Sequence, residues 1–331
     1  MKMLKGCKAV VTGGAGFIGS YLTEELLNRN CEVTVIDDFS AGTLGNIQHL
    51  VRNSSLRVVR EDLKCPTRLD KIVAENDLIF HLAANPEVRV GQTEPKVHFE
   101  ENVVVTFNLL EAIRRAGKEK TLVFASTSTV YGEASVLPTP EDYGPCAPIS
   151  TYGASKLASE ALMTSYMHTF GHRGLILRLA NVVGPGSNHG VIPDFIRKIL
   201  ANPKELEVLG DGTQEKSYLY ITDLIGAIMH LTEHCLEKTG KSAIYNVGSK
   251  DKITVKEIAR TVAAEMGCPR IRYRFTGGVD GGRGWKGDVK NMQLSIQKLL
   301  TTGWKPRFSS KQAVKLAAHE LAQELRKKQR A

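Results

Sequence analysis

The segment Gly13-Gly-Ala-Gly-Phe-Ile-Gly19 joins two stretches of different hydrophobic pattern. Before it, residues 8–12 form a short apolar run typical of a buried strand, and after it apolar residues recur at helical spacing over 17–28. A second apolar run, 32–36, follows. This order predicts a strand, a glycine-rich turn, a helix and a strand, in which the backbone amides of the turn can approach a phosphate at the helix N-terminus.

Strand-like and helix-like runs continue to alternate through the first half of the chain, which is typical of a parallel sheet with helices on both faces. The expected fold class is therefore α/β, a doubly wound parallel (Rossmann) sheet with a smaller mixed α/β C-terminal lobe. Further strands are expected near 56–59, 78–82, 121–125 and 175–179, and the long helices at 96–116 and 150–169.

After residue 181 the alternation loosens into segments that contain glycine and proline. A strand–helix–strand stretch ends in an apolar run, 243–247, which can return to the main sheet. The predicted domains are a dinucleotide-binding domain, 1–180, to which 217–247 returns, and a substrate lobe made of 181–216 and 248–331.

The composition is that of an ordinary globular protein, with 331 residues, 42% hydrophobic and 24% charged. No apolar run is long enough for a membrane span, and the N-terminus leads into a strand without a signal core, so we expect a cytoplasmic protein. A net charge of +9 suits an anionic ligand, although a dispersed excess of lysine is common background. Because no stripe of arginines with interleaved aromatics is present, no nucleic-acid partner is expected.

The cysteines and histidines show no spacing typical of a metal site. His81, at the end of an expected strand, is interpreted as a structural hydrogen-bonding residue. The cysteines are scattered without a close pair, which favours reduced thiols that serve in packing; they are Cys7, Cys31, Cys65, Cys146, Cys235 and Cys268.

Asp37 ends the second expected strand, 18 residues past Gly19, where a carboxylate can bind the hydroxyls of an adenosine ribose. A carboxylate would repel a 2'-phosphate, so the sequence favours NAD over NADP as cofactor. The alternative interpretation is a tight glycine turn followed by an aspartate in a loop.

Tyr152 and Lys156 lie four residues apart, on one face of an expected helix that follows the hydroxyl-rich strand end Ala125-Ser-Thr-Ser128. A tyrosine has an ordinary pKa of about 10. A buried lysine beside it, together with the positive ring of the bound dinucleotide, can lower that pKa and turn Tyr152 into a base. The alternative is a packed aromatic beside a lysine on a solvent-exposed helix face.

These segments resemble the extended short-chain dehydrogenase/reductase superfamily, and within it the NAD-dependent epimerase/dehydratase family, most closely the archaeal kind of UDP-glucose 4-epimerases. The resemblance covers essentially the whole chain. The landmarks that carry it, besides those above, are Asp62-Leu63, His81-Leu-Ala-Ala-Asn85, Asn102, Arg178-Leu-Ala-Asn181, Gly210-Asp-Gly-Thr-Gln214 and Arg283-Gly-Trp-Lys-Gly-Asp288.

The resemblance implies that the glycine segment holds the pyrophosphate of NAD, Asp37 the ribose, and Asp62 with Leu63 the adenine. Leu82, Ala83 and Ala84 are then expected on the nicotinamide side. The full set of implied cofactor-binding residues is Gly13, Gly16, Phe17, Ile18, Gly19, Asp37, Asp38, Ser40, Gly42, Asp62, Leu63, Leu82, Ala83, Ala84, Asn102, Ser126, Tyr152 and Lys156.

The resemblance also implies the catalytic residues, Tyr152 as base, Lys156 as its polarising partner and Thr127 as the hydroxyl that binds the sugar oxygen. Lys216 stands where relatives usually have arginine, and Arg283 is two residues farther from Asp288 than in many bacterial relatives. The implied substrate-binding residues are Thr127, Tyr152, Asn181, Lys216, Arg283 and Asp288.

Sugar dehydratases carry an acidic pair after the threonine, and decarboxylating relatives keep a glutamate there, whereas this chain has Ser128 and Thr129. The resemblance therefore implies 4-epimerisation of a UDP-hexose through a 4-keto intermediate. Three alternatives remain open from the sequence: an epimerase of UDP-glucuronate or a UDP-N-acetylhexosamine, a reductase that releases NADH, and a non-catalytic dinucleotide sensor.

The family's usual homodimer implies that the helices at 96–116 and 150–169 pair with those of a second copy. Val97, Val104, Leu109 and Ile113 offer apolar material for that interface, although a helix buried within the monomer would show the same pattern.

Overall fold

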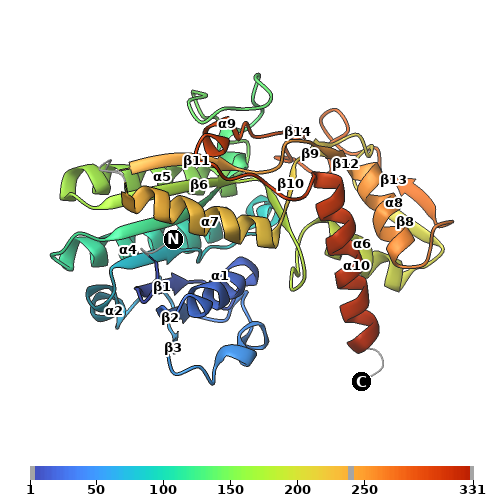
Figure 1. Cartoon of the computed structure of the whole chain (residues 1–331). Helices are drawn as coiled ribbons and strands as arrows, with labels where there is room; N and C mark the ends of the chain where they lie inside the picture. Colours follow the sequence, from blue (N-terminus) through green and yellow to red (C-terminus); the bar gives the residue numbers. More distant parts are fainter. Residues whose placement is uncertain (1–3, 238–241, 329–331) are drawn as a thin grey trace. The chain divides into compact units, whose positions relative to one another are not determined.

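The large sheet contains seven strands in the order β11-β6-β5-β4-β1-β2-β3 in this computed structural model, which describes residues 4–237 and 242–328 (Figure 1). Every neighbouring pair from β3 through β2, β1 and β4 to β5 is parallel. The strands are β1 (Lys8–Thr12), β2 (Glu32–Asp37), β3 (Leu56–Arg60), β4 (Leu78–His81), β5 (Thr121–Thr127), β6 (Arg173–Leu179) and β11 (Ser242–Val247).

The strand order reverses at β1, which lies between β2 and β4. In open α/β sheets the carboxyl ends of the strands at such a reversal form the ligand-binding edge. The predicted doubly wound sheet is confirmed. The expectation that the run 243–247 returns to the main sheet is also confirmed, since β11 pairs with β6.

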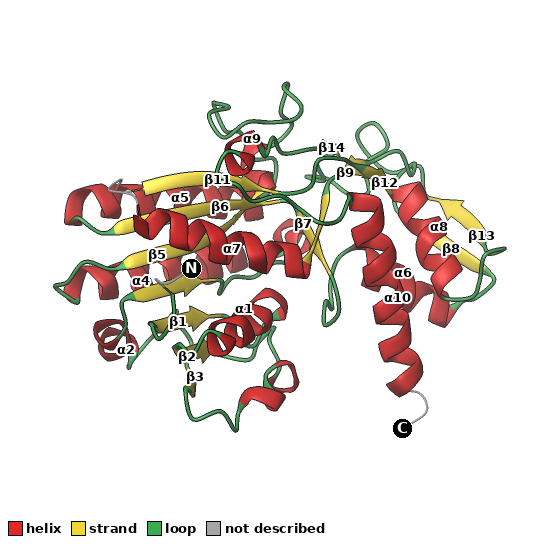
Figure 2. Cartoon of the chain, viewed as in Figure 1, coloured by secondary structure: helices red, strands yellow, loops and turns green. Residues whose placement is uncertain are grey.

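Helices lie on both faces of this sheet (Figure 2). They are α1 (Phe17–Asn28), α2 (Leu69–Glu75), α3 (Pro95–His98), α4 (Val105–Arg115), α5 (Thr151–Phe170) and α7 (Ile221–Glu237). Short 3-10 turns are η1 (Leu44–Asn46), η2 (Gln48–Leu50), η3 (Val88–Gln92) and η5 (Ser128–Tyr131).

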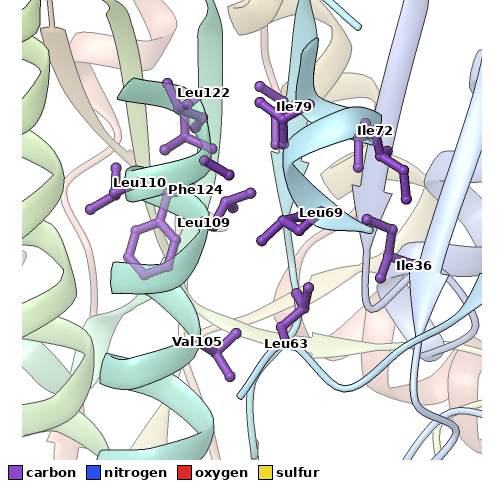
Figure 3. Packing of buried hydrophobic residues seen from close by; sticks show 14 of the residues in the cluster. Ile36, Leu63, Leu69, Ile72, Ile79, Val105, Leu109, Leu110, Leu122 and Phe124 are labelled. Atoms are coloured by element: carbon purple, nitrogen blue, oxygen red, sulfur yellow. The ribbon is translucent and has the colours of Figure 1, made fainter. Parts of the chain in front are cut away.

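One face of the sheet packs against α2, α4 and α5 through a continuous apolar cluster. Figure 3 shows Leu109 and Leu110 beside Phe124, and Leu69 and Ile72 on the neighbouring helix. The opposite face is buried as well, because α1 packs against β1 and β2 there. Burial on both faces explains why the strands are uninterrupted apolar runs rather than alternating ones.

The single helix expected at 96–116 is wrong in detail. The chain forms α3, then a π-helical turn, η4 (Phe99–Val104), and then α4. The wider turn carries Asn102, whose side chain is buried. Its amide oxygen and its amide nitrogen both form hydrogen bonds within the protein. Such π-helical turns occur frequently at functional sites.

The chain divides into two compact units. Unit 1 contains 1–130, 151–178 and 225–245, and unit 2 contains 131–150, 179–224 and 246–331. The predicted domain boundaries, which kept 131–150 with the dinucleotide-binding domain, stay a prediction.

Unit 2 consists of three small sheets and four helices within the described residues. Helix α8 packs against α6 and α10, and its start is fixed by a capping box in which Thr254 and Glu257 bond reciprocally. The elements are β7 (Asn181–Val183), α6 (Val191–Ala201), β8 (Glu205–Val208), β9 (Glu215–Lys216), β10 (Tyr218–Tyr220), β12 (Ile253–Thr254), α8 (Val255–Glu265), β13 (Arg272–Phe275), β14 (Asn291–Met292), α9 (Gln297–Leu300) and α10 (Ser310–Lys328).

Two cysteines that are distant in the sequence are close in space, and both are free thiols, as expected. The Sγ atoms of Cys7 and Cys31 are 2.8 Å apart. The two residues directly precede β1 and β2, which pair in parallel, so residues distant in sequence meet in space. The side chain of Cys235 lies outside the described residues.

Within residues 4–237 and 242–328, no helix is both long and apolar enough to cross a membrane.

Candidate active site

The glycine segment between β1 and α1 leaves no room for side chains. A Cβ atom at Gly19 would lie 2.1 Å from the carbonyl oxygen of Gly13, and one at Gly13 would lie 2.8 Å from the amide nitrogen of Ala83. Gly13 also has φ +69°, which disfavours any other residue. Bare backbone therefore faces the carboxyl end of the sheet at this turn.

Helix α1 begins directly after this turn with its first amides unoccupied by any capping side chain. Its N-cap, Gly16, has no side chain to accept a hydrogen bond, and no acidic residue lies in the first turn. Free amides and the helix dipole make this end a site for an anion such as a pyrophosphate. Phe17 and Ile18 are half-buried in that first turn.

Asp37, at the end of β2, is held against the glycine turn. Its Oδ2 accepts from the amide of Ala15 at 2.9 Å and its Oδ1 from the amide of Phe39 at 2.8 Å. Burial raises the pKa of this carboxyl, and the two amide bonds oppose that effect. The carboxylate is thus fixed where a ribose hydroxyl next to the pyrophosphate can donate to it.

The residues after Asp37 form a compact loop. The amide and hydroxyl of Ser40 donate to Asp38 at 2.9 and 2.6 Å. A Cβ at Gly42 would lie 2.8 Å from the backbone of Ala15, so this glycine lets the loop close on the turn. Gly42 therefore lies against the glycine turn, and Asp38 and Ser40 belong to the same loop. Their contact with a cofactor stays a prediction.

The other predicted cofactor residues of this region differ in exposure. Asp62 is half exposed and accepts from the amide of Lys64, whereas Leu63 is buried. Ala84 is half-buried just beyond β4. The glycine turn with Asp37 fits an adenine dinucleotide, which this set of residues would hold along the carboxyl ends of β1, β2 and β4.

Tyr152, Lys156 and Thr127 are brought together by α5 and the end of β5. The phenol of Tyr152 is hydrogen-bonded to the Thr127 hydroxyl. Lys156 is 3% exposed, donates to the carbonyl of Ala125 at 2.9 Å, and lies 4.8 Å from the centre of the Phe124 ring. A phenol, a hydroxyl and an ammonium therefore share one desolvated corner.

The pKa values in this corner differ from the expectation that Lys156 lowers that of Tyr152. Burial raises the pKa of Tyr152 to about 12, and the bond to Thr127 only partly opposes it. Burial also lowers the pKa of Lys156 to about 8, while Glu160 acts in the opposite direction. In the protein alone, desolvation outweighs every local charge, so the phenol stays protonated at neutral pH.

Glu160 and Arg178 form a buried ion pair beneath Lys156 that sequence reasoning missed. Arg178 donates from Nη2 to Glu160 at 2.7 Å and from Nε at 3.1 Å, and both side chains are nearly inaccessible. The hydroxyl of Ser126 donates to the same carboxylate in a short hydrogen bond. Glu160 lies four residues after Lys156 on α5, a helical spacing that could have signalled it.

His81 and Asn102 belong to one buried hydrogen-bond chain. The amides of Leu82 and Ala83 donate to the Thr12 hydroxyl, which bonds to Nδ1 of His81 at 2.7 Å. Nε2 of His81 bonds to Thr106 at 3.0 Å, whose hydroxyl donates to the carbonyl of Asn102. Because Thr106 uses its own proton, Nε2 carries the histidine proton.

This chain explains what the two residues do. Burial lowers the pKa of His81 to about 3, so it stays neutral, and its predicted structural role is confirmed. Asn102 accepts from the amide of Asn85 and donates to the Ser155 hydroxyl, which donates to the carbonyl of Tyr152. Asn102, predicted to bind the cofactor, has both ends of its amide engaged by the protein and positions the helix that carries Tyr152.

The predicted substrate residues of unit 2 are occupied by internal partners. Lys216 bonds to Asp288 at 2.5 Å, and Asp288 is 3% exposed. Arg283 binds Glu133 through Nε at 3.2 Å and Nη2 at 2.6 Å. Asn181 donates to the carbonyl of Ser217 at 3.2 Å. An anion that binds here must therefore compete with Asp288 and Glu133 for the two cations.

No group of three or more His, Cys, Asp or Glu side chains that could hold a metal ion occurs in the described part of the chain.

Comparison with known proteins adds the family to this geometry. The model of the NAD dependent epimerase/dehydratase family matches residues 9–248. The chain belongs to this family. It is an NAD-dependent enzyme family, and the assignment of the glycine turn and Asp37 to the cofactor stays a prediction.

Individual relatives agree with this membership. A protein of Methanocaldococcus jannaschii named "Putative UDP-glucose 4-epimerase" is 31% identical over 92% of this chain and 95% of its own length. A crystal structure of a UDP-galactose 4-epimerase is 45% identical with a TM-score of 0.85, covering 96% of this chain and 99% of the other. A UDP-glucuronic acid 4-epimerase from Bacillus cereus, solved with UDP-glucuronic acid and NAD, is 32% identical with a TM-score of 0.84 at the same coverage.

Gly19→Ala is expected to weaken NAD binding at least about tenfold, because the new methyl group displaces the carbonyl of Gly13 from the pyrophosphate turn. Gly45→Ala is the matched control, since a Cβ there meets nothing nearer than 3.7 Å. Isothermal titration of cofactor-free protein with NAD measures both. Equal affinities for the two variants would contradict the assignment of this turn.

The lowered pKa of Lys156 predicts that the stability of the cofactor-free protein depends on pH. This pKa is lowered from the usual 10.5 to about 8, so between these values the folded chain has released a proton that the unfolded chain still binds. Stability from this group therefore rises with pH across that window. Relative to Lys156→Met, the unfolding free energy of the wild type should gain roughly 1–3 kcal/mol between about pH 7.5 and 10.5.

Urea unfolding followed by circular dichroism tests this, with Lys71→Met at an exposed position of α2 as control. Parallel pH curves for wild type and Lys156→Met would show that burial does not shift the lysine.

Proposed function

We propose that this protein interconverts UDP-glucose and UDP-galactose by 4-epimerisation. The observation that carries the proposal is the phenol of Tyr152, hydrogen-bonded to Thr127 in a corner that also holds the buried ammonium of Lys156. A phenol and a hydroxyl that already bond to each other can both bond to one sugar oxygen. A dinucleotide sensor needs the glycine turn but has no use for this arrangement.

The residues after Thr127 support epimerisation over elimination or decarboxylation. Thr129 bonds to Thr127 through its amide at 3.2 Å and its hydroxyl at 3.1 Å, and Ser128 is buried. No carboxylate occupies either position. Neither position therefore supplies a second acid, and reversible oxidation at C4 requires none.

The proposed mechanism assigns one task to each residue of the corner. Tyr152 takes the proton of the sugar 4-hydroxyl, and Thr127 holds the same oxygen. Bound NAD supplies a reversible hydride acceptor for C4. Lys156 adds positive charge near the phenol and has Nζ protons for the nicotinamide ribose. After the 4-keto sugar rotates to present its other face, the hydride would return from the reduced cofactor to C4, Tyr152 would return the proton to the sugar oxygen, and the other epimer would form.

The UDP part of the substrate is proposed to bind residues of unit 2, Asn181, Lys216, Arg283 and Asp288. Lys216 offers a point charge rather than a two-pronged guanidinium, so its phosphate contact is less directional than an arginine's. Both cations are paired with carboxylates, and a diphosphate carries the charge needed to exchange with them.

A second candidate substrate is UDP-glucuronate. The similarity to the Bacillus cereus UDP-glucuronic acid 4-epimerase supports it, and a UDP-N-acetylglucosamine 4-epimerase from Methanobrevibacter ruminantium M1 keeps the N-acetylated hexosamines as alternatives. The cytoplasmic location and a role in galactose metabolism stay predictions from the sequence.

Tyr152→Phe is expected to lower turnover of UDP-galactose roughly 10²–10⁴-fold, since the proton of the sugar hydroxyl loses its acceptor. Tyr166→Phe, on the same helix but with its hydroxyl bonded to Glu111, is the matched control and should keep activity within about twofold. A coupled assay for UDP-glucose measures both. If the wild-type protein is inactive with UDP-galactose but active with UDP-glucuronate, the proposed hexose substrate is wrong and the proposed epimerase activity still holds.

We also infer that the protein forms a homodimer through η4, α4 and α5. The expectation that Leu109 and Ile113 contact a second copy is wrong, because both side chains are completely buried in the core of unit 1. The exposed apolar residues of this region are aromatic instead. Phe99 is 58%, Phe107 43% and Phe170 44% exposed, and Tyr166 packs edge-on between Phe107 and Phe170.

Phe107→Asp is expected to shift the protein from dimer to monomer at micromolar concentration, because a carboxylate would be buried without a partner in the interface. Leu200→Asp, at an equally exposed position of α6 in unit 2, should leave the dimer intact. Sedimentation velocity measures the state of each. A monomeric wild type would contradict the inference.

A further inference from the structure

Cys7 and Cys31 occupy equivalent places beside two paired strands. β1 begins at Lys8 and β2 at Glu32, which are register partners, and the amide of Glu32 donates to the carbonyl of Cys7 at 2.8 Å. Cys7 directly precedes Lys8 in the chain, and Cys31 directly precedes Glu32. Their sulfurs are 2.8 Å apart, so an approach of about 0.8 Å brings them to the roughly 2.0 Å length of a disulfide bond.

The two thiols differ in access and in chemistry. Cys7 is half-buried, whereas Cys31 is fully buried and donates to the carbonyl of Leu4 at 2.7 Å. The thiol of Cys7 donates to the sulfur of Cys31, and this bond is the main reason that the pKa of Cys31 is lowered to about 7 and that the pKa of Cys7 is raised. A reachable thiol therefore lies next to a buried sulfur that ionises near neutral pH.

We propose that Cys7 and Cys31 are a modification site at which this chain forms an internal disulfide. The cross-link closes residues 7–31, which comprise β1, the glycine turn and α1. It therefore encloses the whole strand–turn–helix segment that carries the cofactor-binding glycines. A disulfide stabilises mainly by restricting the unfolded chain, so the enclosed segment resists local and global unfolding.

The oxidation needs a small-molecule disulfide such as oxidised glutathione. The proton of Cys7 passes along the bond to the thiolate of Cys31, and the thiolate so formed at Cys7 attacks one sulfur of that disulfide and releases the first small thiolate. Cys31 then loses its proton to solvent. The thiolate of Cys31 then attacks the sulfur of Cys7 and releases the second. The two cysteines together lose two electrons and two protons, and the small disulfide is reduced to two thiols, so the exchange balances.

The site lies at the opposite end of β1 from the cofactor. The cysteines precede the first residue of this strand, and the glycine turn follows its last, so about 16 Å of strand separates them. Closing the bond leaves the arrangement of Tyr152, Lys156 and Thr127 untouched. The cross-link is thus expected to raise the melting temperature of the protein and to leave its enzymatic turnover unchanged.

The experiment equilibrates purified full-length protein with oxidised and reduced glutathione at several ratios, followed by alkylation of free thiols and peptide mass spectrometry. We expect a linked pair of peptides that contain Cys7 and Cys31, and free thiols at the other cysteines. The oxidised form should melt roughly 5 °C above the reduced form. Cys7→Ser should lose this difference, whereas Cys65→Ser, at an exposed position, should keep it.

Two results would overturn the proposal. One is a lasting glutathione adduct on Cys7 with Cys31 still free, which would show that the buried thiolate cannot reach its neighbour. The other is a set of free thiols at Cys7 and Cys31 under a large excess of oxidised glutathione. Both results are measured on wild-type protein, so neither requires a variant to fold. Neither measurement depends on the proposed epimerase activity.

Discussion

A positive charge held without water at the end of β5 is the constraint on which the rest of the site depends. Burial of an ammonium is costly unless it has a charged or hydrogen-bonding partner. Lys156 has the carbonyl of Ala125 and the nearby carboxylate of Glu160. Glu160, itself buried, is in turn paired with Arg178. The buried lysine is therefore accompanied by a buried ion pair, which connects α5 to β6.

The same desolvation controls the phenol. Within the protein alone it holds the pKa of Tyr152 well above neutrality, at about 12. A base that is inactive until a positive charge arrives beside it gives the oxidised cofactor control over proton transfer. In this account the chain positions the phenol and excludes water from it, whereas the positive charge that lowers its pKa comes with the cofactor. The hydrogen-bond chain from Thr12 through His81 and Asn102 fixes the backbone on both sides of that corner.

The sequence predicted the parts of this site that depend on local pattern. The glycine turn, the carboxylate of Asp37 and the four-residue spacing of Tyr152 and Lys156 are all visible in short segments, and the structure places each on the expected element. Contacts between distant segments were not predictable in this way. The pairing of Glu160 with Arg178 and of Cys7 with Cys31 depends on which strands and helices become neighbours. The π-helical turn at Asn102 has no signal in the hydrophobic pattern, because the one residue that it buries is polar.

The pKa of Tyr152, measured without and with NAD, tests the central claim most directly. Tyrosine labelled with 13C at the ring carbon that bears the hydroxyl reports ionisation by NMR, and Tyr152→Phe assigns the signal. The account predicts a value near 12 in cofactor-free protein and a fall of at least about two units when oxidised NAD binds, with a smaller change for the uncharged reduced ring. A pKa already near neutrality without cofactor, or one that oxidised NAD leaves unchanged, would contradict it.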